Sequence, residues 1–168
     1  SYSVTGVQTC ALPISKKEDF LMNITFSNQK IFSSQQVNDL YTSVGWTAYT
    51  NDLPKLLRAI SKSSLVISAW NGEELVGLIR ALTDEETIAY IQDILVLPVY
   101  HKEGVGSELM RRILSELKGI RQIVLMTDQG EANLPLHDWY RSFGFKFFED
   151  WGTIGFAIFD VGEAEVNL

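Results

Sequence analysis

Apolar side chains recur every three and four residues in the N-terminal third of the chain, a spacing typical of helices that bury one face. Ser33-Ser34-Gln35-Gln36 matches a capping box, and the apolar spacing behind it ends at Gly45. Asn51 or Asp52 can cap a second amphipathic stretch, in which Pro54 occupies the first turn, where no backbone N–H is needed. We therefore expect two consecutive helices.

The pattern then changes to apolar runs separated by turn residues, which is typical of strands. The runs are Leu65–Trp70, Leu75–Arg80 and Thr87–Leu97. Asn71-Gly72 separates the first two runs and is a strong hairpin signal. A turn at Asp84–Glu86 leads into the third run, whose nearly continuous apolar character fits a strand covered on both faces. The pattern predicts three antiparallel strands.

A long amphipathic helix is predicted from Val105 to Gly119, with Glu108 and Arg112 spaced as an i,i+4 ion pair. Gln122–Thr127 follows as a short, apolar and β-branched run. The two elements, together with the preceding run, predict a strand, a crossover helix and a parallel strand.

The C-terminal part predicts one further helix, from about Asn133 or Pro135 to Phe143. Phe145–Phe148 and Thr153–Phe159 then have the composition of strands, and we expect them to form a final hairpin.

The composition fits one well-buried domain, since 46% of the 168 residues are hydrophobic. The formal net charge of −7 disfavours nucleic acid as a partner and suits small cationic substrates such as amines, although surplus acid commonly serves solubility alone. No apolar run approaches the ~20 residues needed to cross a bilayer, so we expect a cytoplasmic protein with no membrane partner. The single cysteine, Cys10, excludes a disulfide framework, and no cysteine and histidine cluster has metal-ligand spacing, so we expect no metal.

The first residues have a foreign character. Val4–Ile14 resembles the translation of a sequencing-library adapter. We therefore expect residues 1–21 to be a non-native leader, residues 22–160 to form a single domain, and residues 161–168 to be a tail.

A glycine loop between the third strand and the long helix carries the clearest chemical signal. In His101-Lys102-Glu103-Gly104-Val105-Gly106 the glycines let backbone N–H groups turn inward, and the helix that follows directs its positive dipole end to the same place. This arrangement predicts a pocket for phosphate groups. A turn of this kind can also be purely structural.

The order of these elements, together with two motifs, resembles the GNAT superfamily of acyl-CoA N-acyltransferases from about Met22 to Phe159. The loop at residues 101–106 is similar to the family's Gln/Arg-x-x-Gly-x-Gly/Ala, with His101 in place of Gln or Arg and Lys102 as a compensating charge. Asn133 through Tyr140 to Gly144-Phe145 is similar to the family's Asn…Tyr-x-x-x-Gly-Phe. The resemblance implies an α/β (α+β) GNAT fold: a mixed, mostly antiparallel sheet of about six to seven strands and about four helices, splayed into a V at the acetyl-CoA site.

The same resemblance implies acetyl-CoA as the co-substrate. The backbone of Leu95 and Leu97 would pair with the pantetheine amides, the amides from Lys102 to Ser107 would hold the pyrophosphate, and Asn133 would contact the pantetheine arm. An ordinary helix cap is the alternative role for Asn133. The expected cofactor-binding residues are Leu95, Val96, Leu97, His101, Lys102, Glu103, Gly104, Val105, Gly106, Ser107, Asn133 and Tyr140.

Catalysis by this route needs a proton donor and a proton acceptor. Tyr140 matches the family's tyrosine, and a phenol of pKa about 10 suits a leaving thiolate of pKa near 8.5. A core tyrosine is the alternative. Asp93 lies inside an apolar run and is the candidate base, because burial would raise its pKa; the alternatives are a structural carboxylate and a water chain that replaces a single base.

The acceptor pocket of such folds would be lined by Trp46, Tyr49 and Trp151, although core packing also explains three aromatic residues. We expect an N-acetyltransferase that transfers the acetyl group from acetyl-CoA to a primary amine of a small molecule by direct attack in a ternary complex. A non-catalytic CoA-binding regulatory module and a protein or peptide N-acetyltransferase are the alternatives. Family likeness alone suggests a homodimer.

Overall fold

The computed structural model describes residues 23–159, which divide into two compact units, one ending at Met126 and the other beginning at Thr127. The proposed leader at residues 1–21, with Cys10, and the proposed tail at residues 161–168 lie outside the described residues. Each unit is described by itself below.

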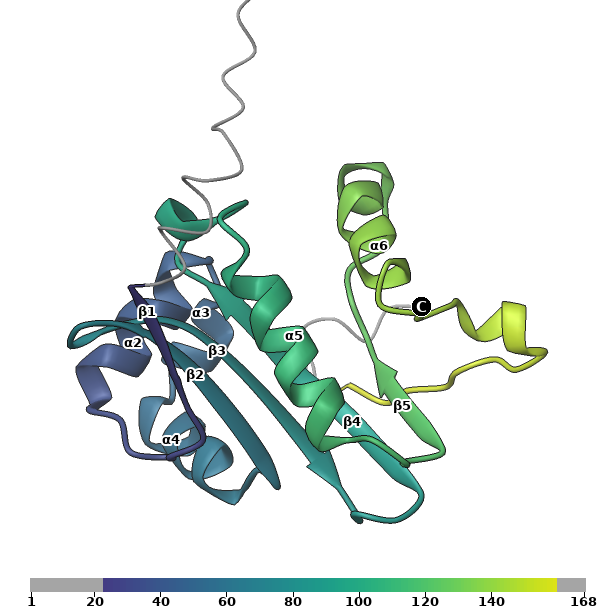
Figure 1. Cartoon of the computed structure of the whole chain (residues 1–168), viewed down its shortest axis with the longest axis horizontal. Helices are drawn as coiled ribbons and strands as arrows, with labels where there is room; N and C mark the ends of the chain where they lie inside the picture. The colour runs from purple at the N-terminus through teal and green to yellow at the C-terminus, as the bar shows by residue number, and fades with distance from the viewer. Residues whose placement is uncertain (1–22, 160–168) are drawn as a thin grey trace, which may run out of the picture. The chain divides into compact units, whose positions relative to one another are not determined.

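A five-stranded mixed sheet forms the centre of the first unit (Figure 1). Its strands are β1 (Ile24–Ser27), β2 (Leu65–Asn71), β3 (Glu74–Thr83), β4 (Ile88–Val96) and β5 (Gln122–Leu125), in that spatial order. Neighbours pair antiparallel except β4 and β5, which are parallel and joined by a crossover helix. The α+β class is confirmed, but the expected six to seven strands are corrected to five within residues 23–159, and β1 is a strand that the sequence pattern did not predict.

The helices of this unit follow the predicted capping signals. The N-terminus of α2 (Ser34–Ser43) has the capping box, in which Ser33 accepts from the Gln36 N–H and the Gln36 side chain accepts from the Ser33 N–H. α3 (Thr47–Thr50) is a short helix that was not expected. In α4 (Leu53–Lys62) the Asp52 carboxylate accepts the Lys55 N–H. These caps fix where each helix begins.

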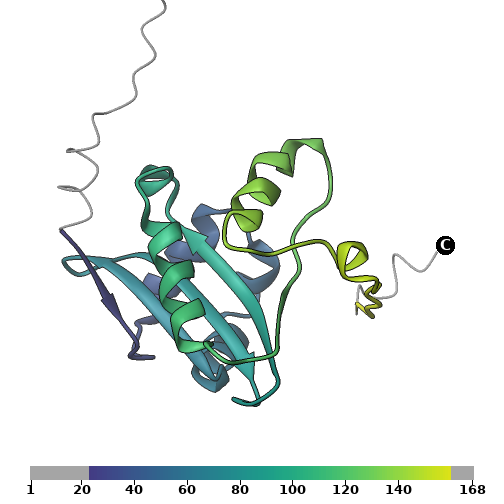
Figure 2. The ribbon, with the colours of Figure 1, turned by 45° about the vertical axis from the view of Figure 1, so that its right-hand side comes forward.

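The crossover helix α5 (Val105–Glu116) covers one face of the sheet (Figure 2). Gly77 in β3 faces it closely, because a Cβ at this position would lie 3.1 Å from Leu109 Cδ1. A Cβ here would also lie 3.2 Å from the Leu95 carbonyl oxygen, so a larger residue requires these neighbours to shift by a few tenths of an ångström. Glu108 and Arg112 form the predicted i,i+4 ion pair on the outer side of α5, at 2.8 Å.

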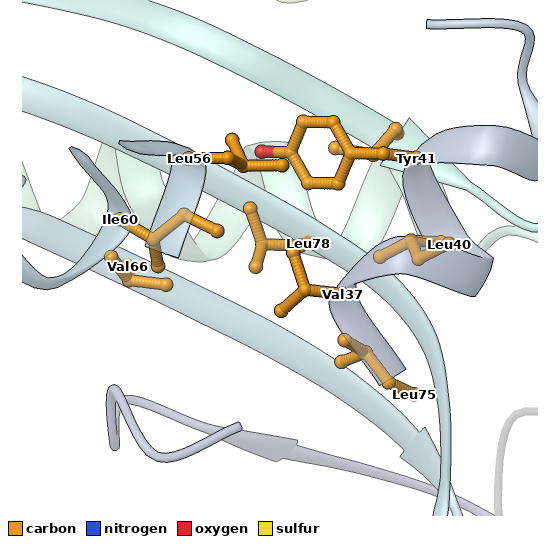
Figure 3. Close-up of a cluster of buried hydrophobic side chains, with 9 residues drawn as sticks. Val37, Leu40, Tyr41, Leu56, Ile60, Val66, Leu75 and Leu78 are labelled. Carbon is orange, nitrogen blue, oxygen red and sulfur yellow. The ribbon is translucent and has the colours of Figure 1, made fainter. Parts of the chain in front are cut away.

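The opposite face of the sheet packs against α2, and side chains of α4 join the same buried cluster, which Figure 3 shows. Full burial of each aliphatic side chain contributes roughly 1.5–3 kcal/mol. The cluster consists of Val37, Leu40, Tyr41, Leu56, Ile60, Val66, Leu75, Leu78 and Leu95. Tyr41 is the one member that also brings a polar group into the layer.

The second unit contains η2 (Glu131–Asn133), α6 (Leu134–Arg141) and η3 (Phe148–Trp151). The hairpin expected from Phe145–Phe148 and Thr153–Phe159 is wrong, since neither segment is a strand. Local side-chain bonds explain the difference: Asp150 accepts the Phe147 N–H at 3.2 Å, and the Thr153 hydroxyl donates to the Phe148 carbonyl at 3.0 Å. These bonds close a 3₁₀ turn where a strand ladder would need free backbone groups.

Candidate active site

The glycine loop connects the end of β4 to the start of α5. Pro98 opens η1 (Pro98–Tyr100), and two left-handed residues follow, Lys102 at φ +66° and Gly104 at φ +92°. Left-handed backbone at a lysine is uncommon and costs about 1 kcal/mol or more. The pair of left-handed residues turns the chain sharply into the first turn of α5.

No side chain caps the N-terminus of α5, and Gly104 itself is the N-cap residue. The first turn of a helix has N–H groups without intrahelical partners, and the helix dipole makes the place attractive to anions. Val105 is fully buried and anchors the turn, whereas Gly106 keeps its side of the helix free of a side chain. This geometry fits a phosphate or pyrophosphate group.

Tyr100 fixes the near end of the loop to the β2–β3 hairpin. Its hydroxyl donates to Glu74 Oε2 at 2.8 Å and accepts from Asn71 Nδ2 at 2.9 Å. The loop therefore begins from a rigid anchor. His101 points back to β4, where its Nε2 lies 2.7 Å from the Val96 carbonyl oxygen, so this nitrogen carries the ring proton.

The backbone of β4 is open along part of its length. β5 pairs only with Ile88–Ile91, so the rest of β4 has no strand on that side in the described residues. The Leu97 N–H donates to the Val76 carbonyl at 2.8 Å, and the Leu97 carbonyl accepts from Tyr100 at 2.9 Å. Strand alternation then directs the backbone groups of Val96, rather than those of Leu95 and Leu97, to the open edge.

Beyond Ile91, this edge of β4 is therefore open in the described residues. An extended ligand with amide groups can pair with such an edge as an added strand does. The open edge leads directly into the loop and the uncapped start of α5. Both parts of the predicted CoA site therefore lie on one continuous stretch of backbone in the first unit.

A buried ion pair joins β4 to its neighbour β3. Asp93 is 1% exposed and Arg80, its register partner on β3, is 5% exposed. Arg80 Nε donates to Asp93 Oδ2, and the Tyr41 hydroxyl from α2 donates to the same oxygen at 2.8 Å. Burial lowers the pKa of the Arg80 guanidinium, but the charge and the hydrogen bond of the Asp93 carboxylate together outweigh burial, so the pKa is raised. Desolvation, reinforced by Asp93, raises the pKa of the Tyr41 phenol far above its ordinary range.

A β-bulge at Gln92 explains why two consecutive side chains reach this layer. The register of β3 against β4 shifts by one residue between the Arg80–Asp93 pair and the Ala81–Ile91 pair, which leaves Gln92 as the extra residue. Gln92 Nε2 donates to the Tyr49 hydroxyl of α3 at 2.9 Å. Burial, followed by the Asp93 charge, raises the pKa of Tyr49.

Three aromatic rings from α2, α3 and the turn between them cover this network. The ring centroids of Trp46 and Tyr49 are 5.8 Å apart, and Tyr41 lies 6.0 Å from Trp46 and 5.6 Å from Tyr49. Trp46 and Tyr49 are half-buried, so each ring keeps an accessible side. The structure thus brings together two of the three predicted acceptor residues with Asp93.

The remaining predicted residues belong to the second unit. Tyr140 is 8% exposed, and burial raises the pKa of its phenol, although a hydrogen bond with the Thr127 side chain lowers it in part. Asn133 is the N-cap residue of α6 but makes no capping bond; its Nδ2 donates to the Gln129 carbonyl at 3.3 Å. Trp151 is 65% exposed and stacks under the Lys146 ammonium at 4.8 Å.

Three residues of this network were not predicted from the sequence: Arg80, Tyr41 and Gln92. The sequence does contain a signal for Arg80, because Arg80 and Asp93 are oppositely charged residues in neighbouring apolar runs. Tyr41 falls within the helical spacing that ends at Gly45, which gives no sign of its polar role, and nothing in the sequence indicates the bulge at Gln92. Across residues 23–159, no group of three or more His, Cys, Asp or Glu side chains could hold a metal ion, and no helix is long and apolar enough to cross a membrane.

Curated relatives with similar sequences are acetyltransferases by name. The chain is 32% identical over 111 residues to an uncharacterized N-acetyltransferase ycf52-like protein of Prochlorococcus marinus, across 62% of this chain and 61% of that protein. It is 31% identical over 137 residues to the Glycine max protein named histone acetyltransferase TAP1, across 70% of this chain and 56% of that one. The chain thus spans less than two thirds of either relative.

A solved structure shows the same arrangement of elements. The GNAT family acetyltransferase SP0256 from Streptococcus pneumoniae TIGR4 superposes with a TM-score of 0.70 at 34% sequence identity, covering 83% of this chain and 99% of that one. The model of the acetyltransferase (GNAT) family matches residues 32–145, a range that contains α2, the buried ion pair, the glycine loop and Tyr140. The chain belongs to the GNAT family of acetyltransferases.

Proposed function

We propose that this protein transfers an acetyl group from acetyl-CoA to a primary amine of a small molecule, by direct attack within a ternary complex. The observation that carries the proposal is the open edge of β4, which runs without interruption into the uncapped first turn of α5. The edge suits the two amides of a pantetheine arm, and the turn suits a pyrophosphate. Few other ligands combine these two requirements.

The residues of the loop divide the binding between them. The N–H groups from Lys102 to Ser107 would hold the pyrophosphate, with the Lys102 side chain supplying a positive charge beside it. The N–H of Val96 would pair with the arm on the open edge, because the Val96 carbonyl already accepts from His101. We place Leu95 and Leu97 in the supporting backbone, because Leu97 is already bonded on both sides.

The acceptor ammonium loses two protons, one before attack and one once its nitrogen is bonded to the acetyl carbon, and the departing thiolate takes up one, so that one proton is released overall. The acceptor nitrogen forms a bond to the acetyl carbon, and the carbon–sulfur bond breaks. We assign Tyr140 as the acid that protonates the departing sulfur, since its raised pKa keeps the phenol protonated at neutral pH. Asp93 is the candidate base, with Oδ1 as the atom that receives a proton because Oδ2 is already engaged twice.

The test measures thiol release from acetyl-CoA by the full chain with a panel of amines: glucosamine, spermidine, phenylethylamine and lysine. Wild-type protein should release thiol with one class of amine. The Tyr140→Phe variant should lose roughly ten- to a thousandfold in kcat at unchanged affinity for acetyl-CoA. Binding of acetyl-CoA without transfer to any amine would instead indicate the non-catalytic CoA-binding module.

A protein-directed activity is the second candidate, and the similarity to the Glycine max protein named histone acetyltransferase favours it. Lysine-containing peptides therefore belong in the same panel. Higher kcat/KM with a peptide than with free lysine would identify the acceptor as a protein, whereas the reverse order supports a small molecule.

A further inference from the structure

The two oxygens of the Asp93 carboxylate have different surroundings. Arg80 and Tyr41 both bond to Oδ2, while Oδ1 is buried and has no hydrogen-bond partner among the described residues. A buried carboxylate oxygen without a partner costs about 1–3 kcal/mol, and such oxygens are rare in folded proteins. Its persistence beside a candidate substrate site points to a chemical use.

Tyr49 is the polar side chain best placed to serve Oδ1. Its hydroxyl accepts from Gln92, the residue next to Asp93, and its ring lies 5.6 Å from that of Tyr41, whose hydroxyl bonds the same carboxylate. A phenol has one proton to donate and two lone pairs. Gln92 occupies one lone pair, so the proton and the second lone pair of Tyr49 remain for other partners.

Tyr49 also reaches the surface, whereas Asp93 does not. Tyr49 is half-buried and Asp93 is 1% exposed. A protonated amine that packs against the rings of Trp46 and Tyr49 can therefore donate a hydrogen bond to the Tyr49 oxygen but cannot contact the carboxylate directly. The raised pKa of Tyr49, caused by burial and then by the Asp93 charge, keeps this phenol protonated and ready to donate.

Resting on the acetyl transfer proposed above, we propose that the Tyr49 hydroxyl passes a proton from the acceptor ammonium to Oδ1 of Asp93. Gln92 is the positioning residue that holds the Tyr49 oxygen in place, and the β-bulge puts it there. The ammonium gives its proton to the Tyr49 oxygen as the Tyr49 proton moves to Oδ1. The products are a neutral amine, an unchanged phenol and a protonated Asp93.

Arg80 limits how long Asp93 keeps the proton. A protonated Asp93 leaves the buried guanidinium of Arg80 without its counter-ion, which is costly, so the proton returns to solvent by the same path after transfer. The titratable groups that interact with the Asp93 carboxylate are Tyr41 from α2, Tyr49 from α3, Arg80 from β3 and Tyr90 from β4. Among the four, Tyr49 alone is both half-buried and bonded to the bulge residue.

The experiment compares Tyr49→Phe with Tyr90→Phe, a matched control that removes a second phenol whose pKa is raised by burial and then by the Asp93 charge. With the best amine of the panel, Tyr49→Phe should lower kcat about a hundredfold at nearly unchanged KM. Because fewer acceptor molecules are protonated as the pH approaches about 10, the deficit should narrow between about pH 7 and pH 9.5. Tyr90→Phe should retain wild-type kcat and pH profile.

Gln92→Met tests the positioning role, since it preserves shape and removes the donor. It should lower kcat roughly tenfold, and the double variant with Tyr49→Phe should be no slower than Tyr49→Phe alone, because the two residues act in one step. Wild-type turnover in Tyr49→Phe, or a deficit independent of pH, would overturn the relay while leaving acetyl transfer intact. No transfer by the wild-type protein to any amine would overturn the proposed function, and the relay with it.

Discussion

The buried ion pair makes a quantitative prediction about stability. Asp93→Asn keeps the shape of the side chain but leaves the guanidinium of Arg80, which is 5% exposed, without a counter-ion. Breaking a buried pair in this way costs about 3–5 kcal/mol. For a protein of this size the loss corresponds to a fall in Tm of roughly 10 °C. Since small domains are stable by about 5–15 kcal/mol, the variant should still fold.

Replacing the whole network should restore most of the loss. A triple variant, Tyr41→Phe, Arg80→Met and Asp93→Leu, has no buried charge and no unpaired hydroxyl, and replacing such pairs by apolar side chains is often neutral or stabilising. Its free energy of unfolding should lie within about 1–2 kcal/mol of wild type. If Asp93 also takes part in catalysis, the triple variant will bind acetyl-CoA but transfer no acetyl group.

Urea unfolding followed by circular dichroism measures these differences. The single and triple variants are compared at one pH and one salt concentration. An Asp93→Asn variant within about 0.5 kcal/mol of wild type would refute the assignment of a charged, buried pair. A triple variant as unstable as the single one would show that packing, rather than the orphaned charge, accounts for the loss.

Three shorter predictions follow from the loop and the strand turn. Gly106→Val puts a branched side chain at the first turn of α5 and should weaken acetyl-CoA binding about tenfold or more in calorimetry, with the helix content retained; unchanged affinity would exclude the loop. Lys102→Gly relieves the left-handed strain at φ +66° and should stabilise the fold by about 0.5–1 kcal/mol in urea, while the lost charge lowers acetyl-CoA affinity severalfold. The Asp84 carboxylate accepts hydrogen bonds from the Ile88 N–H, the Thr87 hydroxyl and two further N–H groups, which hold its pKa well below the ordinary value. Its contribution to stability is therefore present above about pH 4 and is lost as the pH falls. Asp84→Ala should lower the free energy of unfolding at neutral pH and make that free energy fall less steeply in acid.

Elements with local signals were predictable from the sequence. The capping box at Ser33 and the stripe of α5 depend on neighbours within one or two turns, so a single chain segment determines them. The glycine loop was predictable for the same reason. β1 was not, because four residues carry too little pattern and the strand forms only by pairing with β2.

The residues of the candidate site also differ in whether neighbouring residues or distant ones determine their positions. Backbone chemistry at residues 101–107 is local, whereas the role of Asp93 depends on which helix covers it and on the register of β3. A one-residue bulge changes the face that a side chain occupies, and only the paired strands show it. The prediction of a final hairpin was wrong because the side chains of Asp150 and Thr153 form local hydrogen bonds with the backbone. The composition of a strand does not reveal such bonds.

The irregular segment near the C-terminus has a practical consequence for handling the protein. Residues 153–159 contain no charge and no proline, and Ile154, Phe156 and Ile158 alternate with exposures of 69%, 92% and 100%. Such a segment is a template for cross-β association between molecules. Concentrated samples should therefore become turbid with time, and Phe156→Lys, which adds a gatekeeper charge to the segment, should keep them clear.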